Sequence, residues 1–271
     1  GDYKKSIINS SILKIALEYT KTFGGRVISF CQDEFLSKKG VINESIVSTE
    51  LGLKGIPNIS ESINLFRDIE ILSYSGGMIH IPYVSTAKGV ELIRDAKEKN
   101  LDITSSCSLA HITFSEKDIP DFNTNFKIIP PLRSEYDCKS LKEGLIDGTI
   151  DYITSMHEPF DIDKKKVVFD DASSGTIALE SMFGLICNQF TLEKTIDILT
   201  RKKEIFGIDD YPIEIGSKAN LTLFNPDKNY VFSNDNILST SKNCAFIGND
   251  LKGIVYGSIN KDNITLNTTW T

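Results

Sequence analysis

A histidine beside a glutamate is the first place in this chain where acid–base chemistry could arise. His157 and Glu158 follow Tyr152–Thr154, a short run of β-forming residues that is typical of a buried strand. Imidazole and carboxylate groups can both transfer protons near neutral pH. Adjacent residues on an extended chain point in opposite directions, however, so we favour separate roles for the two side chains over an acid–base pair.

The other histidines and the cysteines fit structural roles better than catalytic ones. His80 alternates with isoleucines and His111 lies in an apolar run, a setting that favours buried, hydrogen-bonded imidazoles. Cys31 has no neighbouring His or Lys in sequence to activate its thiol. The five cysteines are widely spaced and form no CxxC pair, which predicts reduced thiols in a cytoplasmic protein.

Strands followed by helices must position these residues, because the chemistry of parallel α/β folds lies where strands end. The hydrophobic pattern predicts strands at 26–31, 78–83, 101–107 and 152–154, and helices at 11–19, 60–72, 87–99, 134–145, 173–188 and 192–203. A long loop is expected at 32–59. From residue 213 the pattern changes to short alternating strands at 220–224, 229–232 and 253–259, which indicates a small antiparallel β segment.

The composition excludes several classes of partner. The 271-residue chain has a formal net charge of −7 and no basic stripe, so nucleic acid and anionic membrane surfaces are not expected to bind it. No apolar run approaches the roughly 18 residues of a membrane span.

Several segments, in order along the chain, resemble motifs of the dihydroorotase family in the cyclic amidohydrolase superfamily. They are 79–88 (H-x-x-H-[VIL]-S-T in the family), 121–133 (D-x-N/D-T-N-x-K-x-N-P-P-L-R), 143–151 (E-G-L-K-D-G-T-I-D), 216–221 (G-x-x-A-D-L) and 241–246 (S-K-N-x-P-F). The resemblance implies an α/β fold, the C-terminal half of a (β/α)8 TIM-type metallo-dependent hydrolase barrel. Residues 1–212 would supply strands four or five to eight, and residues 213–271 a small antiparallel β appendage. Active members use zinc to interconvert dihydroorotate and carbamoyl aspartate in pyrimidine biosynthesis.

The family's functional positions carry apolar or aromatic residues here. Two metal-binding histidines are replaced by Phe30 and Tyr83, and the carboxylate that is both metal ligand and general base is replaced by Met156. Two substrate-contacting side chains are replaced by Ile129 and Phe160. Phenylalanine cannot bind a metal, and a thioether is too soft for a zinc hydroxide site. We therefore expect a packed plug, with no catalytic residue and no metal, because burying one such side chain contributes ~1.5–3 kcal/mol.

Three functions remain open. The first is a catalytically inactive dihydroorotase-like protein with a structural or partner-binding role; the resemblance suggests aspartate transcarbamoylase, or a second copy covering the open half-barrel. The second is an active cyclic amide hydrolase with a rearranged site, built from His157, Glu158, Asp33 and Glu34. The third is a small-molecule sensor that uses a residual pocket; candidate pocket residues are His157, Ser174 and Gly175, the last two matching a family F-G pair whose backbone holds the substrate ring.

Overall fold

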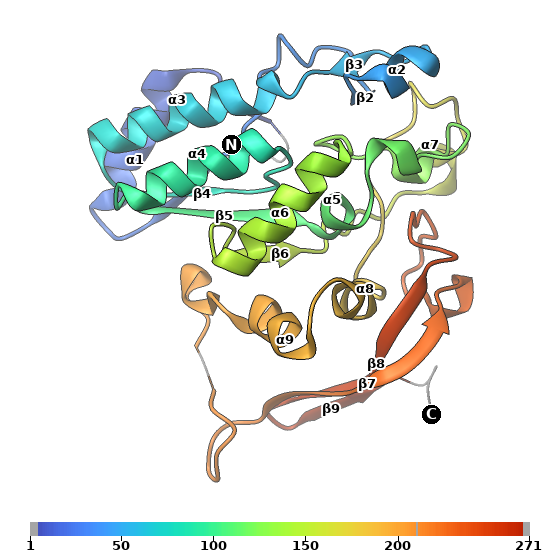
Figure 1. Ribbon diagram of the computed structural model, residues 1–271. Helices are drawn as coiled ribbons and strands as arrows, with labels where there is room; N and C mark the ends of the chain where they lie inside the picture. The colour runs from blue at the N-terminus through green and yellow to red at the C-terminus, as the bar shows by residue number, and fades with distance from the viewer. Residues whose placement is uncertain (1–4, 210, 268–271) are drawn as a thin grey trace.

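A four-stranded parallel sheet forms the centre of the computed structural model, which describes residues 5–209 and 211–267 (Figure 1). Its strand order is β1-β4-β5-β6, and each neighbouring pair is parallel. The strands are β1 (Arg26–Ile28), β4 (Met78–Ile81), β5 (Ile103–Ser108) and β6 (Tyr152–Thr154). The four predicted strands are therefore present, each within two residues of its expected start.

One face of the sheet is covered by a helix that precedes β1 and by three helices that connect the strands (Figure 1). These helices are α1 (Ser10–Lys21), α3 (Ile59–Ser75), α4 (Ala87–Glu98) and α6 (Glu135–Asp147). Capping side chains fix where they begin: Thr86 accepts a hydrogen bond from the backbone N–H of Gly89, and Ser134 forms a capping box with Asp137. Gly148 ends α6 in a left-handed conformation (φ 84°), which glycine adopts without strain.

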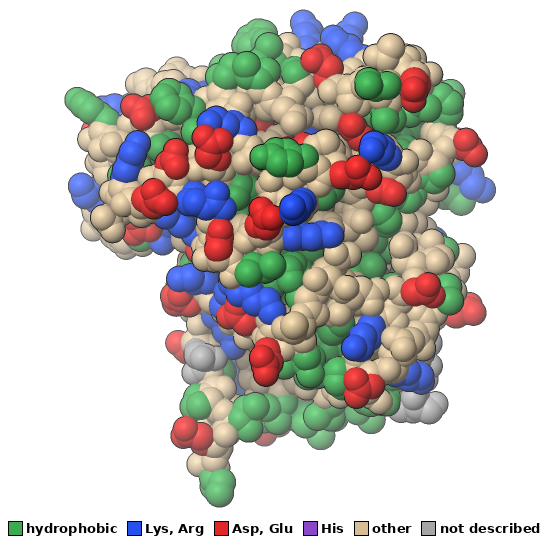
Figure 2. Space-filling model, in the orientation of Figure 1, with side chains coloured by type: hydrophobic (Ala, Val, Ile, Leu, Met, Phe, Trp, Pro, Cys, Tyr) green, Lys and Arg blue, Asp and Glu red, His purple; other side chains and the backbone are tan. Residues whose placement is uncertain are grey.

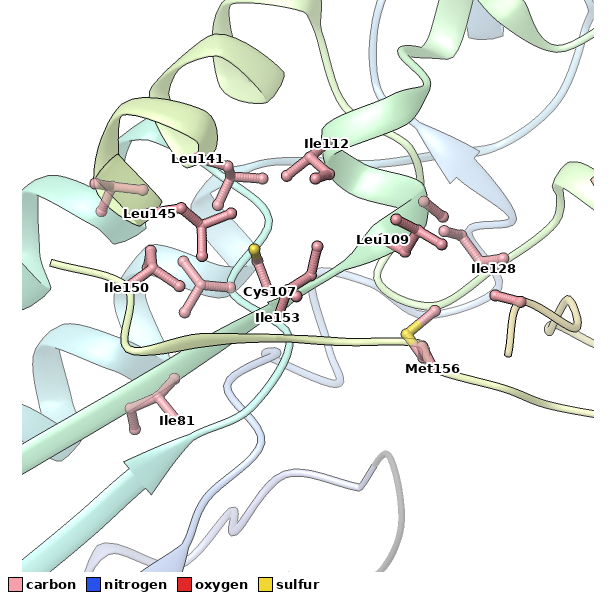
Figure 3. Packing of buried hydrophobic residues seen from close by; sticks show 14 of the residues in the cluster. Ile81, Cys107, Leu109, Ile112, Ile128, Leu141, Leu145, Ile150, Ile153 and Met156 are labelled. Atoms are coloured by element: carbon pink, nitrogen blue, oxygen red, sulfur yellow. The ribbon is translucent and has the colours of Figure 1, made fainter. Parts of the chain in front are cut away.

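The apolar core lies between this sheet face and the helices. Leu141 and Leu145 of α6 pack with Cys107 and Ile153, which project from two neighbouring strands toward the helices (Figure 3). In the described part of the chain, no strand pairs with the free edge of β1 or of β6. The sheet is thus an open half-barrel, as the resemblance implied.

The segment 32–59, expected to be a loop, carries short elements. It contains β2 (Ile42–Asn43) and β3 (Gly55–Ile56), which pair in parallel, and between them α2 (Ile46–Glu50). Further short helices follow the sheet strands and extend into the C-terminal part. They are α5 (Leu109–Thr113), η1 (Glu116–Asp118), η2 (Thr124–Phe126), α7 (Ile162–Lys165), α9 (Leu192–Thr200), η3 (Lys203–Phe206) and η4 (Asn234–Asn236).

The predicted helix at 173–188 is wrong in its first half. Only α8 (Met182–Gln189) is helical, whereas Thr176 forms a parallel bridge with His157. The backbone N–H of Ile177 donates to the carbonyl of Asn243, so this stretch bonds to other segments and cannot form helical hydrogen bonds. The last predicted helix is also shorter, because α9 ends at Thr200.

The C-terminal part is a three-stranded antiparallel sheet in the order β7-β8-β9. Its strands are β7 (Asn220–Val231), β8 (Asp250–Asn260) and β9 (Asn263–Leu266). The two strands predicted at 220–224 and 229–232 are one strand, interrupted by a register shift between Asn225 and Asn229. Helix α8 packs on β8. Among the described residues, no helix has the length and apolarity needed to cross a membrane.

Candidate functional site

The three residues that the resemblance places at the family's metal-ligand positions lie at one edge of the parallel sheet. Phe30 follows β1, Tyr83 follows β4 and Met156 follows β6, and the carboxyl ends of parallel strands meet at the same edge. The rings of Phe30 and Tyr83 meet edge to face with centroids 6.5 Å apart. Met156 is 4% exposed and belongs to the apolar core together with Leu109 and Ile128 (Figure 3). Aromatic and thioether groups therefore fill these strand ends.

Two of these positions have an unusual backbone. Tyr83 has a φ of 57° and Met156 a φ of 47°, the left-handed region that non-glycine residues seldom adopt. Such conformations cost about 1–2 kcal/mol and persist where the surrounding structure enforces them, often at functional sites. The strand ends thus keep a strained backbone geometry although their side chains are apolar.

Ile129 and Phe160, which the resemblance places at substrate-contact positions, are both partly buried. A Cβ added to Gly175 would lie 2.6 Å from the ring of Phe160, so this ring packs directly against the glycine. The N–H of Phe160 donates to the side-chain carbonyl of Asn243 at 3.1 Å. Ile129 lies beside Ile128, which is part of the core. Neither position offers a polar side chain to a substrate.

The residues present do not fit a zinc ion. In residues 5–209 and 211–267, no three His, Cys, Asp or Glu side chains gather as a metal site requires. Cys31 lies near Phe30 in sequence but is buried, and burial together with Asp68 raises the pKa of its thiol well above the usual range. A buried thiol with a raised pKa is a poor nucleophile at neutral pH.

His157 is held by the backbone. Its Nδ1 accepts hydrogen bonds from the N–H groups of Ala178 and Leu179, both at 3.2 Å, and its Nε2 lies 3.4 Å from the hydroxyl of Ser239. An Nδ1 that accepts requires the proton on Nε2, so neither nitrogen is free to take a proton from a substrate. The imidazole acts as a clamp between three segments.

Glu158 lies elsewhere. A Cβ on Gly175 would lie 2.5 Å from its carboxylate, and burial raises the pKa of Glu158 to about 8, with the charge of Lys165 opposing the rise. His157 and Glu158 therefore do not form an acid–base pair in the structure. Asp33 is also committed, since its carboxylate accepts the N–H groups of Phe35 and Leu36 in a local turn.

The remaining candidate pocket residues are Ser174 and Gly175. The N–H of Gly175 donates to the carbonyl of Lys127 at 2.8 Å, and its own carbonyl accepts from the ammonium of Lys165 at 3.0 Å. The backbone of Gly175 is thus used within the protein, and Ser174 is partly buried beside it.

His80 is buried in a polar group that the ring of Phe206 contacts. Its Nδ1 lies 3.0 Å from the hydroxyl of Thr104, and its Nε2 lies 2.8 Å from the hydroxyl of Tyr152, whose ring stacks on it. Burial, with smaller effects of Arg26 and Lys97, lowers the pKa of His80 to about 4. This is the neutral, hydrogen-bonded histidine that its position between isoleucines indicates.

The motifs that this chain keeps build a buried scaffold, which sequence reasoning did not anticipate. The carboxylate of Glu61 accepts hydrogen bonds from the N–H and hydroxyl groups of both Ser85 and Thr86. Arg133 is 1% exposed and donates to Ser85 Oγ at 3.1 Å and to Asn43 Oδ1 at 2.7 Å. The sequence feature that could have indicated this buried network is Arg133 itself, a charged residue at the end of the otherwise apolar Pro-Pro-Leu-Arg segment.

No protein-family model matches the chain. Among curated proteins, the dihydroorotase of Syntrophus aciditrophicus is 37% identical over 264 residues, covering 94% of this chain and 61% of that protein. The dihydroorotase of Endomicrobium trichonymphae is 39% identical over 255 residues, covering 91% and 60%. This chain is a homologue of the dihydroorotases. It spans about three fifths of the length of these relatives.

Solved structures support the same fold for this dihydroorotase homologue. The L-hydantoinase (dihydropyrimidinase) of Arthrobacter aurescens matches with a TM-score of 0.82 at 18% identity, covering 96% of this chain and 61% of that one. A D-hydantoinase from Thermus sp. has the same TM-score and identity, covering 97% and 61%. The chain therefore has the fold of part of these hydantoinases, a parallel α/β half-barrel with an antiparallel sheet.

Proposed function

We propose that this dihydroorotase homologue serves pyrimidine biosynthesis as a catalytically inactive protein with a structural or partner-binding role. The observation that carries the proposal is the packing of Phe30 against Tyr83 at the ends of β1 and β4, with Met156 buried at the end of β6. A zinc hydroxide needs imidazole or carboxylate ligands and room for water. These strand ends supply neither ligand type.

The partner that we propose is a protein that covers the open half-barrel. Aspartate transcarbamoylase and a second copy of this chain are the two candidates. Their support is an exposed apolar stripe that runs along α1 and extends just beyond both of its ends, with side chains 57–69% exposed at helical spacing; α1 packs on β1, the edge strand of the sheet. The stripe consists of Ile8, Ile12, Ile15, Tyr19 and Phe23.

We propose neither nucleic acid nor membrane as a partner, and we propose a cytoplasmic location. On the face shown in Figure 2, acidic and basic side chains are interspersed without an extended basic patch. All five cysteines are free, and four of them are buried, as in proteins kept reduced.

A rearranged hydrolase is less well supported. It would need His157 as a base, yet the Nδ1 of this residue already accepts two backbone N–H groups. It would also need Glu158 within reach of the same substrate, whereas this carboxyl is buried against Gly175.

The test is a metal analysis combined with an assay of dihydroorotate hydrolysis. An active dihydroorotase of the family, assayed in parallel, is the positive control. We expect less than one tenth of an equivalent of zinc per chain after growth in zinc-supplemented medium, and no turnover above background. Stoichiometric zinc together with turnover would refute the proposal.

A further inference from the structure

The apolar stripe of α1 faces away from the core of the protein. Leu13 and Leu17 of this helix are fully buried, where α1 packs on α3, β1 and β4. On the opposite side of the helix, Ile12, Ile15 and Tyr19 are 57–69% exposed. A surface helix of a globular protein typically buries one apolar stripe and leaves its other face polar. A second apolar stripe on the same helix therefore indicates a surface that another molecule covers.

The members of the stripe are spaced symmetrically along the chain, which favours a second copy as that molecule. When two copies of α1 lie antiparallel with a two-fold axis between residues 15 and 16, Ile8 faces Phe23 of the second copy and Ile12 faces Tyr19 of the second copy. Ile15 lies next to the axis and meets its own counterpart. Two-fold symmetry repeats each contact, so every aromatic ring of the stripe packs on an isoleucine.

The charges beside the stripe are complementary in the same arrangement. Lys14 and Glu18 lie one turn apart along one flank of α1 and form an ion pair at 2.8 Å, with their side chains 41% and 46% exposed. The two-fold axis keeps this flank on the same side in both copies. It also brings Glu18 of the second copy to within about 1.5 Å of the level of Lys14 along the helix. Opposite charges therefore meet across the helix pair at two symmetric places.

We propose that the stripe of α1 binds a second copy of this chain, through two antiparallel α1 helices. This inference rests on the proposed function for its surface, and of the two candidate partners it selects the second copy. One helix pair buries less area than the roughly 1,200–2,000 Å² of a standard interface, so we expect a dissociation constant of about 1–100 µM. Association does not depend on catalysis. A dimer that hydrolyses dihydroorotate would refute the inactive role alone, and an inactive monomer would refute the dimer alone.

Sedimentation velocity of the whole chain at about 1 to 200 µM tests the association. We expect dimers to replace monomers as the concentration rises. Ile15→Asp should raise the dissociation constant at least about hundredfold, because it would bury two carboxylates at the axis. Ile146→Asp is the matched control, since Ile146 is 57% exposed on α6, outside the stripe, and should leave the constant unchanged.

Circular dichroism confirms that both variants are folded. A chain that stays monomeric throughout this range, whether or not it binds aspartate transcarbamoylase, overturns the proposal. Equal effects of the two substitutions overturn it as well.

Charge reversal tests the pairing of the flanks. Lys14→Glu sets carboxylates against each other at both symmetric places and should raise the dissociation constant about tenfold. Lys14→Glu combined with Glu18→Lys restores opposite charges and should recover the original value. Lys88→Glu is the control, because it reverses one member of an exposed ion pair with Glu91 on α4 and should have no effect on association. A double variant as weak as Lys14→Glu would contradict the arrangement.

Disulfide cross-linking tests the direction of the helices. Ile15→Cys places two thiols face to face beside the axis, so mild oxidation should link the copies. Copies of Tyr19→Cys would lie about 10 Å apart along the helices, farther than the roughly 7 Å between Cα atoms that a disulfide can span. The unchanged chain, oxidised in the same way, controls for its five native cysteines. Linkage through both introduced cysteines, or through neither, would overturn the antiparallel pair.

Discussion

The ring of Phe30 meets the ring of Tyr83 edge to face, 6.5 Å between centroids, at the ends of two paired strands. Both residues stand where the resemblance places metal-binding histidines. Edge-to-face aromatic pairs are worth about 0.5–1.5 kcal/mol beyond the area that they bury. The contact therefore stabilises these strand ends, and its contribution to folding can be measured.

Removing the Phe30 ring should destabilise the protein strongly. Phe30 is 5% exposed, and truncating such a ring costs about 3–5 kcal/mol. We expect urea unfolding of Phe30→Ala to show a loss in this range. Phe35→Ala is the matched control, because Phe35 is 78% exposed and should lose little. Equal losses of unfolding free energy in the two variants would mean that the strand ends are hydrated and loosely packed.

The left-handed backbone at Met156 predicts that glycine is a more stable replacement there than alanine, the reverse of the usual order. At φ 47° a Cβ is unfavourable, so Met156→Gly should be about 1 kcal/mol more stable than Met156→Ala. At Ile153, inside β6, glycine should instead be the less stable of the same two replacements. Thermal unfolding of the four variants checks both orders. The same order at both positions would contradict a strained backbone at Met156.

His80 should make the protein less stable in acid. Its pKa is about 4 in the folded state, against 6.5 for an unperturbed histidine, so the unfolded chain binds the extra proton first as pH falls. The contribution of His80 to the free energy of unfolding is complete above pH 6.5 and declines as the pH falls toward 4. At pH 4.5 the free energy of unfolding is about 2–3 kcal/mol lower on account of this group. Urea unfolding at pH 7 and 4.5 should show a smaller decline for His80→Gln. An unchanged decline would place the acid sensitivity on other groups.

Arg133 should be among the least replaceable residues. Its guanidinium is buried and donates to Asn43, Ser85, Asn58 and the carbonyl of Ile56. Arg133→Met would leave these acceptors unsatisfied and cost about 3–5 kcal/mol.

Arg94→Met is the control for Arg133, because the Arg94 side chain is 41% exposed in its ion pair with Asp147. Exposed pairs contribute only about 0–1 kcal/mol. Chemical unfolding compares the two variants. Similar losses of unfolding free energy in the two variants would show that the buried network does not hold together the segments that follow β4 and β5.

His157 should behave as a clamp in stability measurements. His157→Ala removes the acceptor for the N–H groups of Ala178 and Leu179, at a cost of about 1–3 kcal/mol. His157→Asn keeps a side-chain acceptor near the Nδ1 position, so it should recover most of this loss in thermal unfolding. If the two variants were equally unstable, the accepted hydrogen bonds would not be the source of the effect.

The sequence by itself determined the order of the sheet strands and their main helices, and the change to an antiparallel β pattern after residue 213. These features follow from local periodicity, capping residues and residue types, which need no knowledge of contacts. Phe30 lacks a ligand atom in any fold. The largest error fell at 173–181, where the backbone bonds to distant segments such as Asn243. The segment 32–59 was expected to be a loop, but β2 and β3 pair within it.

Only the tertiary structure decided what the remaining polar residues do. It assigned His157 to a backbone clamp, separated it from Glu158 and placed Arg133 in a buried network with Glu61 and Ser85. These relationships join residues tens of positions apart, and hydrogen bonding and burial at such separations depend on packing in three dimensions, which no local pattern records.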